Sequence, residues 1–235
     1  MSIKLCGDDL CTNCGACVNI CPKSAISFCE PNLFGNTYPF INYGKCIGCG
    51  LCLKACPQLK PFSISKEIPS YYAGWSKHFR LFGSSGGVFG ELASLFLKQK
   101  GIVVGAAYNQ DGVLVHSFVE KDSDLSFLLG SKYVTSDTRL IYRQVKDELK
   151  QGRHILFCGT PCQISALYSI IPAKDRTNLL TIDLVCWGAP PQSIYQSYIN
   201  KLSKVKKSKI LKYSFRVLNS NRLDLHVSSG KKSLY

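Results

Sequence analysis

The sequence lacks several features that would place it in common protein classes. It contains no run of 18 apolar residues, as a membrane-spanning helix would need, and its first twenty residues carry Cys, Asp and Asn where an export signal needs an apolar stretch. Acidic residues are scarce, with 15 Asp and Glu against 29 Lys and Arg. We therefore expect a basic, cytoplasmic protein without a membrane span.

What remains is the composition of a folded protein with a substantial core. The chain has 235 residues, of which 46% are hydrophobic and 19% charged. These values exclude a disordered or collagen-like chain, and the length suits one large domain or a small module followed by a medium-sized domain.

Cysteine is the abundant residue, with 13 copies. Without an export signal, such a count indicates metal ligands or redox chemistry rather than a disulfide scaffold. Eight of the cysteines form two runs of the pattern C-x2-C-x2-C-x3-C-P, which is typical of bacterial ferredoxins with two clusters. The runs are Cys11, Cys14, Cys17, Cys21 and then Pro22, and Cys46, Cys49, Cys52, Cys56 and then Pro57.

In this pattern the fourth cysteine of each run binds the cluster of the other run. The sequence therefore predicts two 4Fe-4S clusters with crossed ligand sets. Cluster I is expected on Cys11, Cys14, Cys17 and Cys56, and cluster II on Cys46, Cys49, Cys52 and Cys21. Zinc is the alternative, but eight cysteines in two equal runs with no His nearby fit zinc poorly.

The chain divides into a ferredoxin module and a second part with a different pattern. The two cysteine repeats are separated by an aromatic stretch that we expect to form a hairpin over the clusters, and turn residues suggest a linker at 62–70. We predict an α+β fold in four segments: a ferredoxin-like domain at 1–61, the linker, an α/β domain with a mixed, largely parallel sheet at 71–186, and the start of a C-terminal domain, which we expect to be incomplete, at 187–235.

Apolar periodicity and turn residues place the elements of the α/β domain. The expected elements are helices at 88–99, 137–150 and 161–171 and strands at 101–107, 113–119, 154–158 and 179–186. Thr160 is expected to cap the third helix, with Pro161 in its first position.

Three further cysteines fall at the carboxyl ends of the last two strands, where open parallel sheets bind ligands. Cys158 ends an apolar strand and is interpreted as a buried core thiol. Cys162 lies in the first turn of a helix, whose dipole favours a thiolate, and Cys186 follows a strand, so these two are candidate metal ligands.

Four segments, in the same order, resemble the beta subunit family of coenzyme F-420 (deazaflavin) reducing hydrogenases and dehydrogenases. They are Gly83-Ser84-Ser85-Gly86-Gly87-Val88-Phe89, Gly130-Ser131-Lys132-Tyr133-Val134, Phe157-Cys158-Gly159-Thr160-Pro161-Cys162-Gln163 and Asp183-Leu184-Val185-Cys186. The similarity covers about residues 71–215, and the ferredoxin runs precede it.

This resemblance implies an iron–sulfur flavoprotein that holds FAD and exchanges hydride with a deazaflavin-like or other organic substrate. It also implies that Cys162 and Cys186 bind a third 4Fe-4S cluster together with a downstream C-x2-C. The chain has no cysteine after Cys186 and departs from the family at residues 214–217, so we expect a C-terminally truncated relative.

The candidate flavin site can also be argued from chemistry. A diphosphate needs close backbone N–H groups and positive charge, which the loop Ser84, Ser85, Gly86 and Gly87 offers at the start of a helix. Lys132 and Thr160 are candidate second contacts. Glycine-rich turns are common, however, and a single lysine is more often a solvated surface residue.

The formal net charge of +14 raises the question of a polyanionic partner. Part of this charge comes from a run of lysines near the C-terminal end of the sequence, Lys201, Lys204, Lys206, Lys207, Lys209 and Lys212. This lysine run contains no interleaved aromatic residue, which disfavours nucleic acid as the partner. Its positive charge suits docking of an acidic redox partner such as a ferredoxin or another oxidoreductase subunit.

No catalytic acid, base or nucleophile can be assigned, because the four His residues do not cluster. Two hypotheses remain: an oxidoreductase subunit that couples clusters to flavin, and a non-catalytic ferredoxin-type carrier or inactive truncated homologue.

Overall fold

The computed structural model describes residues 3–61, 68–207, 210, 212–215, 226–228 and 233–234. Residues 62–67 of the expected linker, Lys209 of the lysine run and residues 216–217 lie outside these ranges. The chain forms two compact units, one of Met1–Ser70 with Asp137–Cys186 and the other of Tyr71–Ser136 with Trp187–Tyr235. It crosses between them after residues 70, 136 and 186, and the expected domain boundaries stay a prediction.

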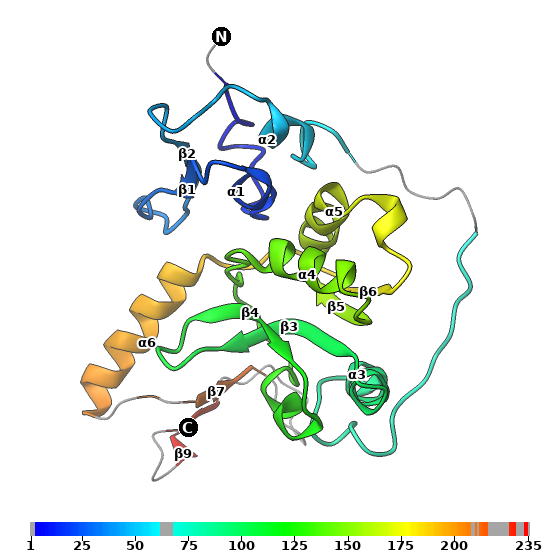
Figure 1. The fold of residues 1–235 in the computed structure, drawn as a ribbon. Coiled ribbons are helices and arrows are strands. Elements are labelled where there is room, and N and C mark those ends of the chain that lie inside the picture. Colours follow the sequence, from blue (N-terminus) through cyan, green and yellow to red (C-terminus); the bar gives the residue numbers. More distant parts are fainter. Residues whose placement is uncertain are drawn as a thin grey trace. The chain divides into compact units, whose positions relative to one another are not determined.

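The N-terminal part of the first unit contains a short helix, then a hairpin, then a second short helix along the chain (Figure 1). The helices are α1 (Ala16–Ile20) and α2 (Leu51–Lys54), and the strands are β1 (Ile26–Phe28) and β2 (Pro39–Ile41). The strands pair antiparallel, with Ile26 opposite Ile41. Ile26, Ile41 and the Cys52 side chain are buried together as a small core, so the expected hairpin between the two repeats is present.

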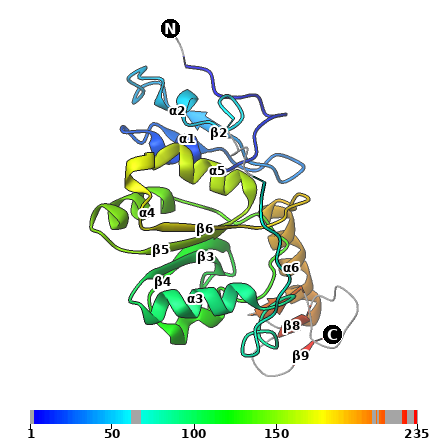
Figure 2. The ribbon, with the colours of Figure 1, turned by 90° about the vertical axis from the view of Figure 1, so that its right-hand side faces the viewer.

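The remainder of the first unit is a strand–helix–strand unit preceded by a helix. Its elements are α4 (Ile141–Lys150), β5 (Ile155–Gly159), α5 (Pro161–Ile170), the 3₁₀ helix η2 (Ala173–Asp175) and β6 (Leu179–Asp183). The strands β5 and β6 are parallel, with Ile155 opposite Leu179. Figure 2 shows α4 and α5 on the same side of these strands, where the buried side chains of Val145, Phe157 and Leu167 form the core.

Local chemistry explains where α5 begins and where β6 ends. Thr160 and Gln163 form a capping box, and the Thr160 N–H donates to Gln163 Oε1 at 3.0 Å. The sequence-based strand 179–186 is too long by three residues. The Leu184 N–H donates to the carbonyl oxygen of Gly159, which is the last residue of β5, and beyond it β5 offers no further ladder partner.

The second unit contains an antiparallel hairpin of strands next to a helix. Its helices are α3 (Val88–Lys98), the 3₁₀ helix η1 (Asp122–Phe127) and α6 (Gln192–Lys206), and its strands are β3 (Ile102–Tyr108), β4 (Leu114–Val119), β7 (Lys212–Ser214), β8 (His226–Ser228) and β9 (Ser233–Leu234). The strands β3 and β4 pair from Val103 with Val119 to Tyr108 with Leu114. The helix α3 packs against β3 and η1, as Figure 2 shows.

The expected α+β class is therefore present, with the antiparallel pair β3–β4 in one unit and the parallel pair β5–β6 in the other. The helix α6 and the strands β7 to β9 were not anticipated from the sequence. Among the described residues, no helix combines the length and apolar character needed to cross a membrane.

Candidate metal centres

Both cysteine repeats form the same local structure, a glycine with positive φ followed by a short helix. Gly15 (φ 79°) precedes α1 and Gly50 (φ 71°) precedes α2. A side chain at Gly15 would also collide with the hydroxyl of Thr138, at 2.4 Å from a Cβ. These turns let the first three thiols of each run face one cavity, while the helix carries the chain to the fourth cysteine.

The structure gathers the eight cysteines into the two crossed sets expected from the sequence. One cavity is lined by Cys11, Cys14 and Cys17 from the first repeat and by Cys56 from the second, with Phe28 and Pro39 of the hairpin also on its wall. The other is lined by Cys46, Cys49, Cys52 and Cys21. Four thiols around each cavity suit a cubane, in which each iron takes one thiolate.

Several thiols of the first cavity have raised pKa values. Burial raises the pKa of Cys14 to about 11 and that of Cys17 to about 12, and the neighbouring thiols add to both shifts. Without a cation the thiols stay protonated at neutral pH, whereas bound iron supplies the charge that holds several thiolates together. No group of three or more His, Cys, Asp or Glu in the described part of the chain is placed to hold a single metal ion.

A fifth thiol, which the sequence did not single out, also lines the first cavity. Cys6 lies in this cavity with Cys11 and Cys56, the two thiols that act on it electrostatically. Burial, followed by these two neighbours, raises the pKa of Cys6 to about 12. Cys6 falls outside the repeated pattern, so spacing alone gave no signal for it.

The first repeat is held by residues more than 100 positions further along the chain. The Tyr142 hydroxyl of α4 donates to the carbonyl oxygen of Cys14 at 2.9 Å. The Arg143 guanidinium donates to the carbonyl oxygens of Val18, Asn19 and Cys21, at 3.0 Å for Val18. The sequence pattern of α4 indicated only an apolar face, so the hydrogen bonds of Tyr142 and Arg143 to the first cysteine repeat were not predicted.

These bonds give partners to the backbone carbonyl groups at the C-terminal end of the short helix α1. An α-helix leaves its last carbonyl oxygens without partners, and α1 has only five residues. The Asn19 side chain adds bonds to the carbonyl oxygens of Gly15 at 2.9 Å and Arg139 at 2.7 Å. The stretch from Cys14 to Cys21 is therefore held by α4 and by the residue Arg139 just before it.

The three later cysteines lie where the topology predicted, at the carboxyl ends of β5 and β6. Cys158 is half-buried in β5, and Cys186 is exposed three residues after β6 ends. Cys162 sits in the first turn of α5, with its sulfur 3.2 Å from Thr160 Oγ1, and it is near enough to Cys14 to raise the pKa of that thiol. The helix α1 lies next to α5 in Figure 1. The role of Cys162 and Cys186 in a third cluster stays a prediction.

The candidate flavin loop before α3 is tightly bonded to its surroundings. Ser85 (φ 58°) and Gly87 (φ 70°) adopt left-handed conformations. Ser84 Oγ accepts a hydrogen bond from the Ser131 N–H at 2.6 Å, so the loop and the segment around Lys132 meet. The Ser76 N–H donates to the carbonyl oxygen of Gly86 at 2.7 Å.

Lys132 has a structural role in the same region. Its Nζ donates to the carbonyl oxygens of Phe127, Leu128 and Leu129 at 3.2, 2.8 and 2.9 Å. These carbonyls end η1, where a cation is stabilising. Thr160 belongs to the other unit, where it caps α5.

The segment ahead of this loop supplies a prediction about Glu91. Ser76 Oγ lies 2.5 Å from Glu91 Oε2, and this hydrogen bond, with a smaller contribution from His78, lowers the pKa of Glu91 below its ordinary value of 4.5. The resulting stabilisation is present above that value and is lost as pH falls through the folded pKa. Ser76→Ala should raise the pKa of Glu91, as measured by carboxyl ¹³C NMR. An unchanged pKa of Glu91 in Ser76→Ala would contradict this assignment. The control is Ser123→Ala, which removes the hydroxyl of an exposed serine elsewhere in the chain and should leave the pKa of Glu91 unchanged.

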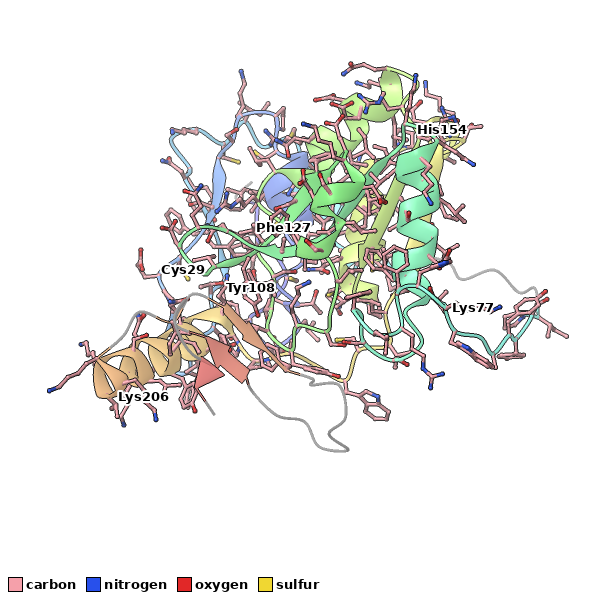
Figure 3. The ribbon with its side chains drawn as sticks, turned by 90° about the horizontal axis from the view of Figure 1, so that it is seen from below. Cys29, Lys77, Tyr108, Phe127, His154 and Lys206 are labelled. Atoms are coloured by element: carbon pink, nitrogen blue, oxygen red, sulfur yellow. The ribbon has the colours of Figure 1, made fainter. Side chains whose placement is uncertain are left out.

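The lysine run lies partly on α6. Lys201, Lys204, Lys206 and Lys207 are exposed, and Figure 3 shows Lys206 at the C-terminal end of the helix. Cations at a helix C-terminus are favourable, so part of this run has a local explanation that needs no partner.

Two regions of the chain match known protein families. Residues 10–59 match the 4Fe-4S dicluster domain family, and residues 152–234 match the family described as the C terminus of the coenzyme F420 hydrogenase/dehydrogenase beta subunit. No curated protein matches. Among solved structures, a chain of the F420-reducing [NiFe] hydrogenase complex from Methanosarcina barkeri is similar, with a TM-score of 0.48, 16% identity and coverage of 71% of this chain.

This chain spans 62% of the length of that hydrogenase chain. The first match covers the cysteine repeats, and the second contains the motifs at 157–163 and 183–186 but not those at 83–89 and 130–134. Residues 10–59 are thus similar to 4Fe-4S dicluster domains, and residues 152–234 are similar to the C terminus of coenzyme F420 hydrogenase/dehydrogenase beta subunits.

Proposed function

We propose that the protein is an iron–sulfur electron-transfer subunit of an oxidoreductase related to the F420 hydrogenases and dehydrogenases. The observation that carries this proposal is the pair of crossed cysteine sets around two cavities. When bound there, two 4Fe-4S clusters supply carriers that each take one electron at a time. The eight thiolates hold them, and the bonds from Tyr142 and Arg143 fix the backbone of the first repeat.

The two cavities differ in how they meet the surface, which suggests a direction for electron exchange. Cys49 is exposed and lies between exposed Ile47 and Leu51, so a redox partner can approach cluster II closely. Cys14 is instead covered by α4, through Tyr142, and lies near Cys162 of α5. We propose that an external protein partner exchanges electrons at cluster II and that cluster I faces α4 and α5.

The partner and substrate follow from the related complex and remain proposals. The similar hydrogenase chain belongs to a complex, so a second oxidoreductase subunit or a ferredoxin is the proposed protein partner. The excess of basic residues suits an acidic partner, which positive charge attracts over a distance. A small organic hydride donor or acceptor of the deazaflavin type is the proposed substrate.

The flavin part of the proposal rests on the motifs that resemble the F-420 beta subunit family and on the loop before α3. FAD, when bound, converts hydride transfer to single-electron transfer. In this chain the loop precedes an 11-residue helix, whose N-terminus favours a diphosphate, and Ser85 is exposed while Gly87 is buried. The Ser84 hydroxyl, the Lys132 ammonium and the Gly87 N–H already have protein partners, so the backbone N–H groups of Ser85 and Gly86 are the proposed contacts.

Flavin content and electron transfer distinguish the two functions that remain. The oxidoreductase predicts that anaerobically purified protein binds FAD at about one per chain and reduces a viologen dye when supplied with reduced deazaflavin. Cluster absorbance with no bound FAD and no dye reduction would favour the ferredoxin-type carrier. Failure of reduced ferredoxin to bleach the clusters would contradict both.

A further inference from the structure

The two cysteine cavities are unequal in the number of thiols that they contain. Five thiols line the first cavity, from Cys6, Cys11, Cys14, Cys17 and Cys56. Among the described residues, four line the second. A cubane needs four protein ligands, one on each iron, so the first cavity has one thiol more than its cluster requires.

The position of Cys6 is fixed by the fold. Immediately after it, the N–H groups of Leu10 and Cys11 donate to the carbonyl oxygen of Gly7 at 3.1 and 3.0 Å, and this turn returns the chain toward Cys6. Leu5 packs on the small core of the first unit and also lines the cavity. The Tyr43 hydroxyl donates to the carbonyl oxygen of Ile3 at 3.0 Å, which ties the segment to the second repeat.

The thiol neighbours of Cys6 are specific. Cys6 shares the cavity with Cys56 and Cys11, the two thiols that act most strongly on it and help to raise its pKa. The groups that shift the pKa of Cys14 and of Cys17 include Cys56 but not Cys6. Cys6 therefore stands next to two of the four expected cluster I ligands and not next to the other two.

We propose that Cys6 is a reserve ligand of cluster I that can take the place of Cys11 or Cys56. The inference rests on the proposed assignment of the cluster ligands. In the exchange, the bond from iron to the Cys11 or Cys56 sulfur breaks and a bond from iron to the Cys6 sulfur forms. The Cys6 thiol gives up its proton and the released thiolate takes one, so no electron is transferred and no other reactant is needed.

Adjacency explains why this exchange is accessible. The entering thiol lines the same cavity as the leaving sulfur, so the chain needs little movement. A cluster with such a reserve would survive the loss or oxidation of one of these two ligands. Cluster II has no equivalent thiol among the described residues, and it provides the comparison.

The test is the iron and sulfide content of the full chain, reconstituted anaerobically as wild type and as alanine variants. Alanine is used because a serine oxygen can itself bind iron. The proposal expects about eight irons per chain in the wild type, in Cys6→Ala, in Cys11→Ala and in Cys56→Ala. It expects about four in the double variants Cys6→Ala/Cys11→Ala and Cys6→Ala/Cys56→Ala. Cys17→Ala, whose thiol has neither Cys6 nor Cys162 among the neighbours that shift its pKa, should also fall to about four, as should Cys49→Ala in cluster II.

A second measurement uses Cys6 itself and does not depend on iron content. In the wild type, Cys6 does not bind iron; because its raised pKa slows the reaction, alkylation by iodoacetamide is followed over hours at alkaline pH. Cys6 should be alkylated slowly in the wild type and protected as an iron ligand in Cys11→Ala and Cys56→Ala. Single variants that carry as little iron as the doubles, or a Cys6 that is alkylated equally in all of them, would overturn the proposal while leaving a wild-type count of eight intact. A wild-type count near zero would overturn the cluster assignment and this inference with it.

Discussion

Cys21→Ala should remove the cluster bound by the second repeat, although Cys21 lies in the first. In the structure, Cys21 lines the cavity of Cys46, Cys49 and Cys52. Loss of one of four ligands, with no spare thiol nearby among the described residues, should leave that cluster unassembled. The expected result is a fall from about eight to about four irons per chain, measured in anaerobically reconstituted protein.

The crossing is tested by comparing spectra between variants. Cys21→Ala and Cys49→Ala should lose the same electron paramagnetic resonance signal, and Cys14→Ala should lose the other one. The double variant Cys21→Ala/Cys49→Ala should lose no more iron than either single variant, whereas Cys14→Ala/Cys21→Ala should lose both clusters. Loss of the same signal in Cys21→Ala and Cys14→Ala would show that each repeat binds its own cluster.

Arg143→Ala should strongly destabilise the first repeat although Arg143 is no metal ligand. Its guanidinium donates to three backbone carbonyl oxygens, those of Val18, Asn19 and Cys21. Hydrogen bonds from a charged donor contribute more than neutral ones, and their removal leaves acceptors unpaired. We expect the free energy of unfolding to fall by about 2–4 kcal/mol, measured by anaerobic urea titration of the cluster absorbance.

Two further variants separate the effect of the hydrogen bonds from that of charge. Arg143→Lys keeps the positive charge but cannot reach three carbonyl groups with the same planar fork, so it should recover less than half of the loss. Lys150→Ala removes a positive charge from an exposed position at the end of α4 and should change stability little. Equal loss in Arg143→Ala and Lys150→Ala would refute the bonding account.

The ferredoxin part of the site could be predicted because its chemistry dictates a spacing. Two-residue spacers and a fourth cysteine before a proline are direct consequences of wrapping a cubane, and the structure sorts the eight thiols accordingly. Thr160 could be recognised as a helix cap for a similar reason, because capping depends on residues three positions apart.

The residues that support the site left no such signal. Tyr142 and Arg143 bind backbone carbonyl groups more than 100 residues away, and any residue at the acceptor position presents the same carbonyl oxygen. Cys6 could not be found by periodicity because it lies outside the repeat. The apolar residues Leu184 and Val185 suggested that the strand continues to Cys186. It ends at Asp183 because its neighbour β5 has already ended and offers no further hydrogen-bonding partner.

The metal and sulfide content of the wild-type protein, together with its spectrum after reduction, tests the central claim most directly. Freshly prepared anaerobic protein should contain about eight irons and about eight sulfides per chain, and its reduced form should show two interacting 4Fe-4S signals. Zinc in place of iron, or a protein that stays colourless on reconstitution, would contradict the account.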